Sequence, residues 1–330
     1  MVSTESGNTT TVIDQPSGNA RLPRRLRAYL AERFPLVGHG VLILSFYSSN
    51  QFLAHALDEP GAPMRYDLGS VCGYLTLLCF FLHLRVFDDH KDYDADCRYF
   101  PDRVLQRGIV TLGELRRLGA AAIVVEFGLA ALCGPGPLAA VAVAFVFSLL
   151  MLKEFFIRDW LKRHFLVYAS VHMLIMPLLA LVVFSFATKR FPWEAPAWYW
   201  LYSFVGFFVA FNWEVSRKIR APEEEVEGVD TYSQLFGTYG AAYLVLAIRL
   251  VDTALVTLVG MHLGVSGWFY ALLIGLFLVC TVGFFQFRFR TSPATARRME
   301  VYAGVYVFAF DLALAIELVR SHGIEFVGTL

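Results

Sequence analysis

Long apolar runs recur along the chain from residue 35 to residue 319 and dominate its pattern. A helix needs about 20 apolar residues to cross the hydrocarbon core of a bilayer. On this basis the sequence predicts nine transmembrane helices, at residues 35–57, 68–87, 118–134, 137–155, 165–187, 196–213, 238–260, 268–287 and 302–319. We therefore expect an all-α fold, a polytopic membrane bundle that fills residues 35–330.

The N-terminal segment has a different pattern. Residues 1–20 are rich in Ser, Thr, Asn and Gly and have no apolar core, which predicts a disordered tail and no cleavable signal peptide. In residues 21–34, arginines alternate with Leu, Tyr and Phe at nearly helical spacing. This favours an interfacial helix on an anionic leaflet, with a solvated linker as the alternative because Pro23 interrupts its start.

Composition supports a membrane protein. Hydrophobic residues make up 57% of the chain and charged residues only 17%, against about a quarter charged in soluble domains. The formal net charge is zero, so nothing indicates nucleic acid as a partner. The five cysteines form no CxxC pair, which argues against a zinc site or a disulfide framework.

The distribution of Lys and Arg predicts the orientation, because these residues favour the cytoplasmic side. With the N-terminus inside, the cytoplasmic segments hold 23 of them and the opposite segments hold 4. We therefore expect a multi-pass protein of the inner or cell membrane of a bacterium. Its N-terminus is cytoplasmic and its C-terminus lies outside.

An aspartate ladder follows the second predicted span. Asp88, Asp92 and Asp96 are spaced i, i+4, i+8, so on a continuing helix they would stack along one face and repel one another. A divalent cation would remove that repulsion, and Mg²⁺ is usually held by one or two carboxylates plus substrate phosphates. With Arg103 and Arg107 shortly after it, this helix end is typical of a site for a metal-bridged diphosphate.

A second acidic cluster follows the sixth predicted span. Glu214 begins it, and Glu223, Glu224 and Glu225 come shortly afterwards. Two interpretations stay open here. The cluster could be a second acidic part of the site, or it could be an ordinary charged surface, in which Glu214 and Lys218, four residues apart, form an ion pair and the glutamate run is a solvated loop.

The positions of the two clusters suggest internal symmetry. Each follows the second helix of a group of four, and both lie on the predicted cytoplasmic side. This favours two four-helix halves plus one further helix, with one acid-bearing helix end from each half at a shared cavity. Repeated halves that meet at a site are a known arrangement in membrane proteins.

At this point the chain resembles the UbiA superfamily of intramembrane prenyltransferases. That family is similar in having nine transmembrane helices and aspartate-rich motifs after helices two and six. Its first motif, NxxxDxxxD, matches the ladder with Asp88 in place of Asn, and the following arginine stretch resembles residues 102–111, with Arg103 as the counterpart. Its second motif, DxxxD, would begin at Glu214, but Lys218 stands where the second acid is expected.

The resemblance implies a function and a set of roles. The substrates would be an isoprenyl diphosphate and a hydrophobic, aromatic or lipid-like acceptor, with Mg²⁺ as cofactor and pyrophosphate as product. The implied metal-binding and catalytic carboxylates are those of Asp88, Asp92, Asp96 and Glu214, with Glu223 and Glu224 as further metal ligands. The implied diphosphate-binding residues are Arg103, Arg107, Lys153, Lys162 and Lys218.

Polar residues inside the predicted spans should face the bundle interior, because exposing them to lipid is costly. This applies to Glu126, His172, Asp311 and Glu317. Asn50, Gln51 and His55 of the first predicted span could line the cavity or form hydrogen bonds between helices. Arg249 and Asp252, three residues apart, are expected to pair with each other.

Two alternative functions remain. A membrane terpene cyclase of the same fold would ionise the diphosphate and close rings within the isoprenyl tail without an acceptor, and the departure at Lys218 leaves room for it. A cation transporter or non-catalytic binding protein is the alternative of another class. Acid clusters at helix ends in the interface, away from the bilayer midplane, argue against a transporter.

Overall fold

The computed structural model describes residues 21–328, and the tail predicted for residues 1–20 lies outside this range. The helices are α1 (Leu22–Arg33), α2 (Leu36–Asp58), α3 (Leu68–Lys91), α4 (Tyr93–Tyr99), α5 (Leu112–Cys133), α6 (Pro135–Leu152), α7 (Arg158–Arg163), α8 (Phe165–Met173), α9 (Ile175–Thr188), α10 (Ala197–Arg217), α11 (Tyr232–Leu263), α12 (Gly267–Phe289) and α13 (Pro293–His322). Short 3₁₀ turns lie at η1 (Glu154–Phe156), η2 (Pro192–Glu194) and η3 (Pro222–Glu224), and two strands at β1 (Met64–Tyr66) and β2 (Ile324–Phe326).

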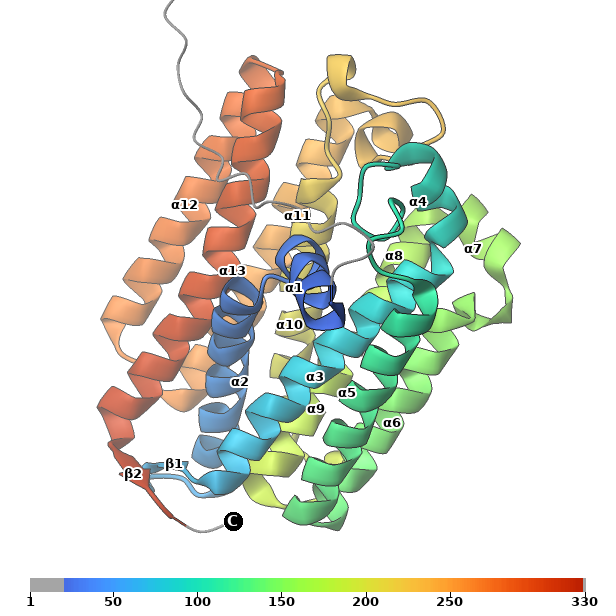
Figure 1. The fold of residues 1–330 in the computed structure, drawn as a ribbon. Helices are drawn as coiled ribbons and strands as arrows, with labels where there is room; N and C mark the ends of the chain where they lie inside the picture. Colours follow the sequence, from blue (N-terminus) through green and yellow to red (C-terminus); the bar gives the residue numbers. More distant parts are fainter. Residues whose placement is uncertain (1–20, 329–330) are drawn as a thin grey trace, which may run out of the picture.

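The long helices stand side by side in one bundle, and each packs against the next one in the chain (Figure 1). The order of packed helices around the bundle is α2, α3, α5, α6, α9, α10, α11, α12 and α13, and α13 also packs against α2. Additional contacts of α9 with α2, and of α10 with α13, join helices that are not neighbours in this order. The helices α3, α6 and α10 all end at the same end of the bundle (Figure 1).

Six helices in the described part of the chain are long and apolar enough to cross a membrane: α3, α6, α8 together with α9, α11, α12 and α13. The other three long helices, α2, α5 and α10, lie at the remaining predicted spans and belong to the same bundle. These three are not among the candidate spans, so the count of nine spans stays a prediction. The bundle is therefore an all-helical membrane fold with at least these six segments as candidate spans.

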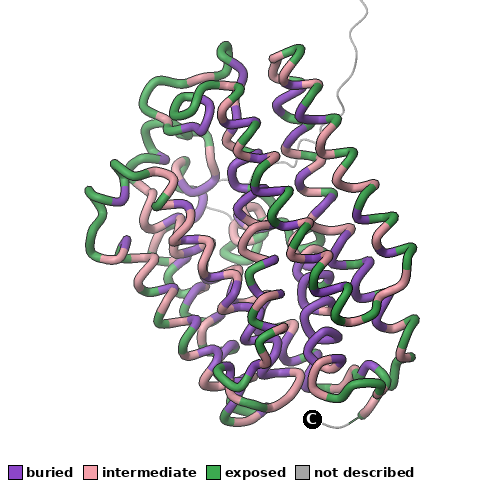
Figure 2. Tube along the Cα trace, turned by 180° about the vertical axis from the view of Figure 1, so that it is seen from behind, coloured by how far each residue is buried: buried purple, intermediate pink, exposed green. Residues whose placement is uncertain are grey.

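The outside of the bundle is apolar. Exposed residues line the outward faces of the helices and buried residues face inward (Figure 2). Val124 and Leu132 of α5 and Ile274 of α12 are large hydrophobic side chains that remain exposed. In a water-soluble domain such surfaces would be covered, so their position matches contact with lipid.

The polar residues singled out within the predicted spans are buried, except for His55, which is half-buried. Arg249 lies 3.1 Å from Asp252 in the predicted ion pair. A further buried cluster joins α3, α5 and α6, in which His83 Nδ1 lies 2.7 Å from Glu126 and its Nε2 lies 3.2 Å from Ser148. Such contacts satisfy polar groups that lipid could not solvate and hold neighbouring helices together.

Glycines with positive φ mark two breaks in the helical pattern. Gly134 (φ 123°) caps α5, and Pro135 begins α6 immediately afterwards, so a tight turn joins the two helices. Gly237 (φ 71°) interrupts α11 near its start, at the end where the second acidic cluster lies. Left-handed backbone of this kind is accessible to glycine at little steric cost.

A small parallel sheet closes the opposite end of the bundle. Met64, Arg65 and Tyr66 of β1 pair with Ile324, Glu325 and Phe326 of β2. The strands therefore join the connection between α2 and α3 to the segment that follows α13 (Figure 1). The rings of Tyr66 and Phe326 also meet edge to face at 6.2 Å.

Candidate active site

The aspartate ladder spans a break between two helices. The prediction of one continuing helix is wrong, because α3 ends at Lys91 and α4 begins at Tyr93. Carboxylates at a helix C-terminus oppose the helix dipole, and stacked carboxylates repel one another, which favours a break here. The one-turn spacing nevertheless persists, since Asp92 N–H donates to Asp88 O at 2.9 Å and Asp96 N–H donates to Asp92 O at 2.8 Å.

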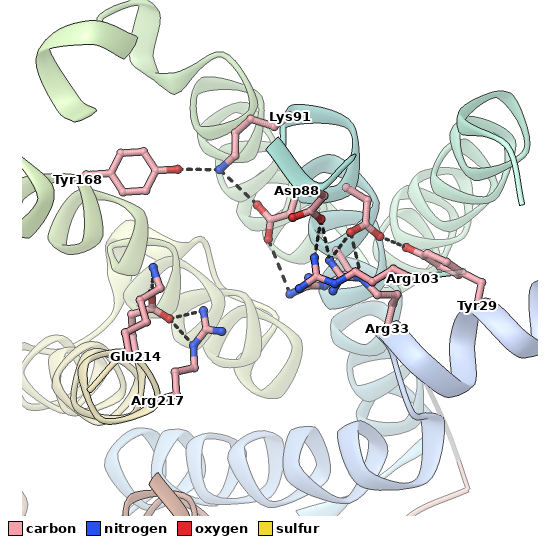
Figure 3. A network of polar contacts seen from close by, with 12 residues as sticks. Tyr29, Arg33, Asp88, Lys91, Arg103, Tyr168, Glu214 and Arg217 are labelled. Atoms are coloured by element: carbon pink, nitrogen blue, oxygen red, sulfur yellow. Dashed lines mark hydrogen bonds and ion pairs between the residues drawn. The ribbon is translucent and has the colours of Figure 1, made fainter. Parts of the chain in front are cut away.

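Basic side chains neutralise two of the three aspartates (Figure 3). Lys91 Nζ lies 3.4 Å from Asp88, and Arg103 donates to Asp96 at 2.6 Å. The Arg103 guanidinium also lies 3.9 Å from the centre of the Phe100 ring. The structure thus brings the predicted Arg103 into direct contact with the ladder.

Asp92 is half-buried and lies near other carboxylates of the site. Burial raises the pKa of its carboxyl group, Lys91 counteracts this, and the negative charges of Asp88, Asp96 and Glu154 raise the pKa further. Burial and the neighbouring carboxylates therefore destabilise the ionised form of Asp92 more than Lys91 stabilises it. A divalent cation would supply the missing positive charge.

The sequence analysis overlooked Asp89, the neighbour of Asp88. Its buried carboxylate accepts a hydrogen bond from Tyr29 OH at 2.6 Å and from Arg33 Nη2 at 2.5 Å, both from α1 (Figure 3). Two features of the sequence could have indicated this contact. Asp89 lies off the one-turn spacing of the ladder, and Arg33 lies at the end of the predicted interfacial helix. Residues 22–33 form α1, and its contacts with Asp89 place it against the ladder.

Further contacts hold α1 against the segment between the ladder and α5. Arg25 pairs with Glu114 at 2.6 Å, and Glu32 accepts the backbone N–H of Val104 at 3.1 Å. Tyr29 packs in a small apolar cluster with Val86, Val104, Leu105, Ile109, Val110 and Leu115. Residues 21–34 therefore do not form a free linker, because they pack on the same end of the bundle as the ladder.

The second acidic cluster contains the ion pair that the spacing allowed. Glu214, in the last turn of α10, pairs with Lys218 at 2.7 Å and with Arg217. Its side chain is only 9% exposed, so it is no ordinary surface residue. Glu225 accepts hydrogen bonds from Thr231 at 2.8 Å and from Gln234 at 2.9 Å at the start of α11.

The remaining predicted residues are exposed. Glu223 and Glu224 lie in η3, Lys153 caps α6, and Lys162 lies on α7. Arg107 follows one turn after Arg103, with its N–H donating to Arg103 O at 2.9 Å. The predicted roles of these residues in binding a metal ion or the diphosphate stay predictions.

The two acidic helix ends are linked through α8 and through a loop contact. Lys91 donates to Tyr168 OH at 2.9 Å, and Lys218 lies 5.0 Å from the centre of the Phe165 ring, so one short helix receives a lysine from each cluster. The backbone of Gly228 lies so close to Tyr99 of α4 that a Cβ there would overlap the hydroxyl group. Both clusters therefore belong to one region at one end of the bundle.

Glu154 is a second residue that the sequence analysis did not single out. The predicted fourth span was drawn through it, whereas α6 ends at Leu152 and Glu154 to Phe156 adopt left-handed backbone with φ of 47°, 54° and 59°. Its side chain is only 4% exposed. Left-handed non-glycine residues cost of order 1–3 kcal/mol each and persist where their surroundings impose them, often at functional sites.

The donor set of the ladder fits Mg²⁺. Among residues 21–328, no three His, Cys, Asp or Glu side chains lie close enough together to hold a metal ion on their own. Mg²⁺ usually keeps several waters and binds one or two carboxylates together with substrate phosphates, so a preformed protein cage is not required. Carboxylates one helical turn apart, with arginines beside them, meet this requirement.

Comparisons with known proteins support this interpretation. The model of the UbiA prenyltransferase family matches residues 52–306. Among curated protein sequences, none matches the chain significantly.

Three solved structures share the fold. An apo UbiA homologue from Aeropyrum pernix K1 is 17% identical, with a TM-score of 0.63, and the match covers 86% of this chain and 98% of that one. A digeranylgeranylglyceryl phosphate synthase is 16% identical, with a TM-score of 0.61 and coverages of 90% and 99%. A UbiA homologue from Archaeoglobus fulgidus, bound to GPP and Mg²⁺, is 14% identical, with a TM-score of 0.51 and coverages of 88% and 99%.

Proposed function

The chain belongs to the UbiA prenyltransferase family, and on that premise we propose that it transfers an isoprenyl group from an isoprenyl diphosphate to a hydrophobic, aromatic or lipid-like acceptor within the membrane. The observation that carries this proposal is the aspartate ladder at a helix end, with Arg103 bound to it and a second acid-bearing helix end beside it. The homologue from Archaeoglobus fulgidus that binds GPP and Mg²⁺ supports the same substrate class.

In the proposed reaction, the bond between the allylic carbon and the diphosphate oxygen breaks, and its electron pair leaves with the pyrophosphate. The acceptor then forms the new bond to that carbon and loses a proton. Asp88, Asp92 and Asp96 would hold Mg²⁺, which supplies positive charge against the departing pyrophosphate. Arg103, Arg107 and Lys218 would bind the phosphate oxygens and stabilise the same charge.

Glu214 would complete the site from the second half of the chain. Glu223 or Glu224 would assist it only after moving from the exposed positions seen in η3. Lys153 and Lys162, on exposed positions at the ends of α6 and α7, would bind further phosphate oxygens. In this proposal the first cluster, Asp88, Asp92 and Asp96, is the main metal site.

The proposed topology follows from the same residues. We place all nine long helices across the bilayer, in two halves of four plus α13, with the N-terminus and the active site on the cytoplasmic side. The exposed apolar faces of α5 and α12 would then contact lipid. The isoprenyl tail would enter the bundle from the membrane, where water that would quench the allylic cation is scarce.

Turnover should require Mg²⁺. Purified protein in liposomes, supplied with C10 to C20 diphosphates and membrane extract as acceptor source, should release pyrophosphate, and chelation of divalent ions should abolish the release. Mass spectrometry of the products would identify tail length and acceptor. A prenylated acceptor supports the transferase, whereas a cyclic hydrocarbon formed from diphosphate alone would support the cyclase. Full activity without divalent ions would refute the proposed site.

Replacement of Lys218 by Ala should raise the KM for the diphosphate about threefold to tenfold, because a partly exposed charged contact to phosphate contributes about 1 kcal/mol. Its side chain is 30% exposed and lies against Glu214. Steady-state kinetics at saturating Mg²⁺ would measure the change. Arg163→Ala, which removes an exposed basic residue of α7, is the matched control, and a KM equal to that of the control would reduce Lys218 to an ion-pair partner.

A further inference from the structure

The helix α1 contacts the aspartate ladder although it lies outside residues 52–306, the part of the chain that matches the family model. Its last residue, Arg33, makes this contact. The Arg33 guanidinium binds Asp89 through Nε at 3.1 Å and Nη2 at 2.5 Å, and Nη2 also lies 3.7 Å from Asp96 Oδ2. Figure 3 shows Arg33 and Arg103 approaching the ladder together.

The two aspartates that Arg33 contacts differ in their surroundings. Asp89 is 1% exposed, and Tyr29 OH donates to its other oxygen at 2.6 Å, so it is a fixed anchor for α1. Asp96 belongs to the ladder and is shared by two guanidinium groups, those of Arg33 and Arg103. One contact of Arg33 therefore holds the side chain in place, and the other reaches a residue proposed to bind metal.

We propose that Arg33 binds the diphosphate directly, as an anion-binding residue that this chain's own N-terminal helix contributes. The inference rests on the proposed function, in which Asp96 helps to hold Mg²⁺. When the Asp96 carboxylate binds the metal, its charge no longer balances both guanidinium groups. Arg103 then lacks its partner, and Arg33, whose charge Asp89 still balances, offers the phosphate oxygens the N–H donor that faced Asp96.

The geometry of Arg33 suits this exchange. A guanidinium has five N–H donors, and the contacts with Asp89 use only those on Nε and Nη2. The side chain is 15% exposed, so its contacts are partly shielded from water and from salt screening. Because Asp89 already fixes the side chain, binding a phosphate costs little further conformational entropy.

A purely structural role for Arg33, as the residue that docks α1 on Asp89, makes a different prediction. In that case Tyr29→Phe, which removes the other contact between α1 and Asp89, should weaken ligand binding as Arg33→Met does. Arg27→Met is the second comparison, because Arg27 is an exposed arginine on the same helix. These variants separate the charge at Arg33 from the docking of α1 and from the general charge of the helix.

The experiment measures binding of inorganic pyrophosphate with Mg²⁺ to the purified full-length protein by calorimetry, together with the KM for the isoprenyl diphosphate. Arg33→Met should weaken pyrophosphate binding and raise KM roughly 10- to 100-fold, the range expected for one charge-assisted phosphate contact. Arg27→Met and Tyr29→Phe should each stay within about threefold of the wild type. If Arg33→Met does not yield folded protein, Arg33→Lys, which keeps the charge but loses the fork, should give a smaller loss in the same assay.

The outcomes separate the inference from the proposed function. A wild-type protein that neither binds pyrophosphate nor turns over would refute the proposed function. A wild-type protein that does both, with Arg33→Met binding as tightly as Arg27→Met, would overturn only the role of Arg33. Equal losses in Arg33→Met and Tyr29→Phe would likewise overturn it and assign Arg33 to docking.

Discussion

Turnover should fall at least about 1000-fold when either Asp88 or Asp92 is replaced by Ala, because the metal charge at the leaving group contributes several kcal/mol and each 1.4 kcal/mol is tenfold in rate. Asp88 and Asp92 are joined through one helical turn, and burial together with the negative charges of Asp88, Asp96 and Glu154 raises the pKa of Asp92. Loss of either carboxylate removes a proposed metal ligand, and the neighbouring side chains of Lys91 and Arg103 are cations that cannot bind the metal in its place. Pyrophosphate release from purified variants at saturating Mg²⁺ measures the effect.

The matched control is Asp94→Ala. Asp94 is an exposed aspartate on α4, two residues from Asp92 and off the one-turn spacing of the ladder. It should retain activity within about twofold, since surface substitutions usually have small effects. Both ladder variants should still insert in membranes and elute as monodisperse protein. Near-normal turnover in both would show that the metal does not bind at this helix end.

Arg249→Met should destabilise the bundle by about 3–5 kcal/mol, the cost of leaving a buried charge unpaired. Arg249 is 1% exposed, pairs with Asp252 at 3.1 Å and donates to Asn212 at 2.6 Å. Its guanidinium also lies 3.5 Å from the centre of the Tyr306 ring, so it joins α10, α11 and α13. Unfolding in mixed micelles, followed by tryptophan fluorescence, would report the loss of stability.

Two further variants test the physical reason. In the double variant Arg249→Met with Asp252→Leu, both charges are absent, and most of the lost stability should return because no buried charge stays unpaired. Arg190→Met breaks an ion pair of similar length, 2.8 Å to Asp58, but its partners are 45% and 24% exposed. It should cost less than about 1 kcal/mol. Equal costs for Arg249→Met and Arg190→Met would contradict the role of burial.

The helices and the first acidic cluster could be predicted from the sequence because their signals are local. An apolar run long enough for a span, bounded by charges, leaves few alternatives in a membrane protein. The spacing of Asp88, Asp92 and Asp96 is also local, and it survives the break after Lys91 because the backbone hydrogen bonds continue through it.

The parts that could not be predicted depend on contacts between distant segments. Asp89 acquires its meaning only when α1 folds back and brings Arg33 and Tyr29 to it. Glu154 is buried by a left-handed turn of three residues, and none of them is a glycine that would have indicated such a turn. In the second cluster, the sequence left the ion pair and the metal site as equal alternatives, and the structure shows the pair of Glu214 and Lys218 formed.

The pairing of β1 with β2 has a consequence for biosynthesis. Residues 64–66 leave the ribosome long before residues 324–326 do. The connection between α2 and α3 must therefore wait, without its partner strand, until α13 has been inserted. A nascent chain that has reached His322 would hold every long helix, α13 included, and would still lack β2, so the strand pairing should form only after α13 has packed against α2.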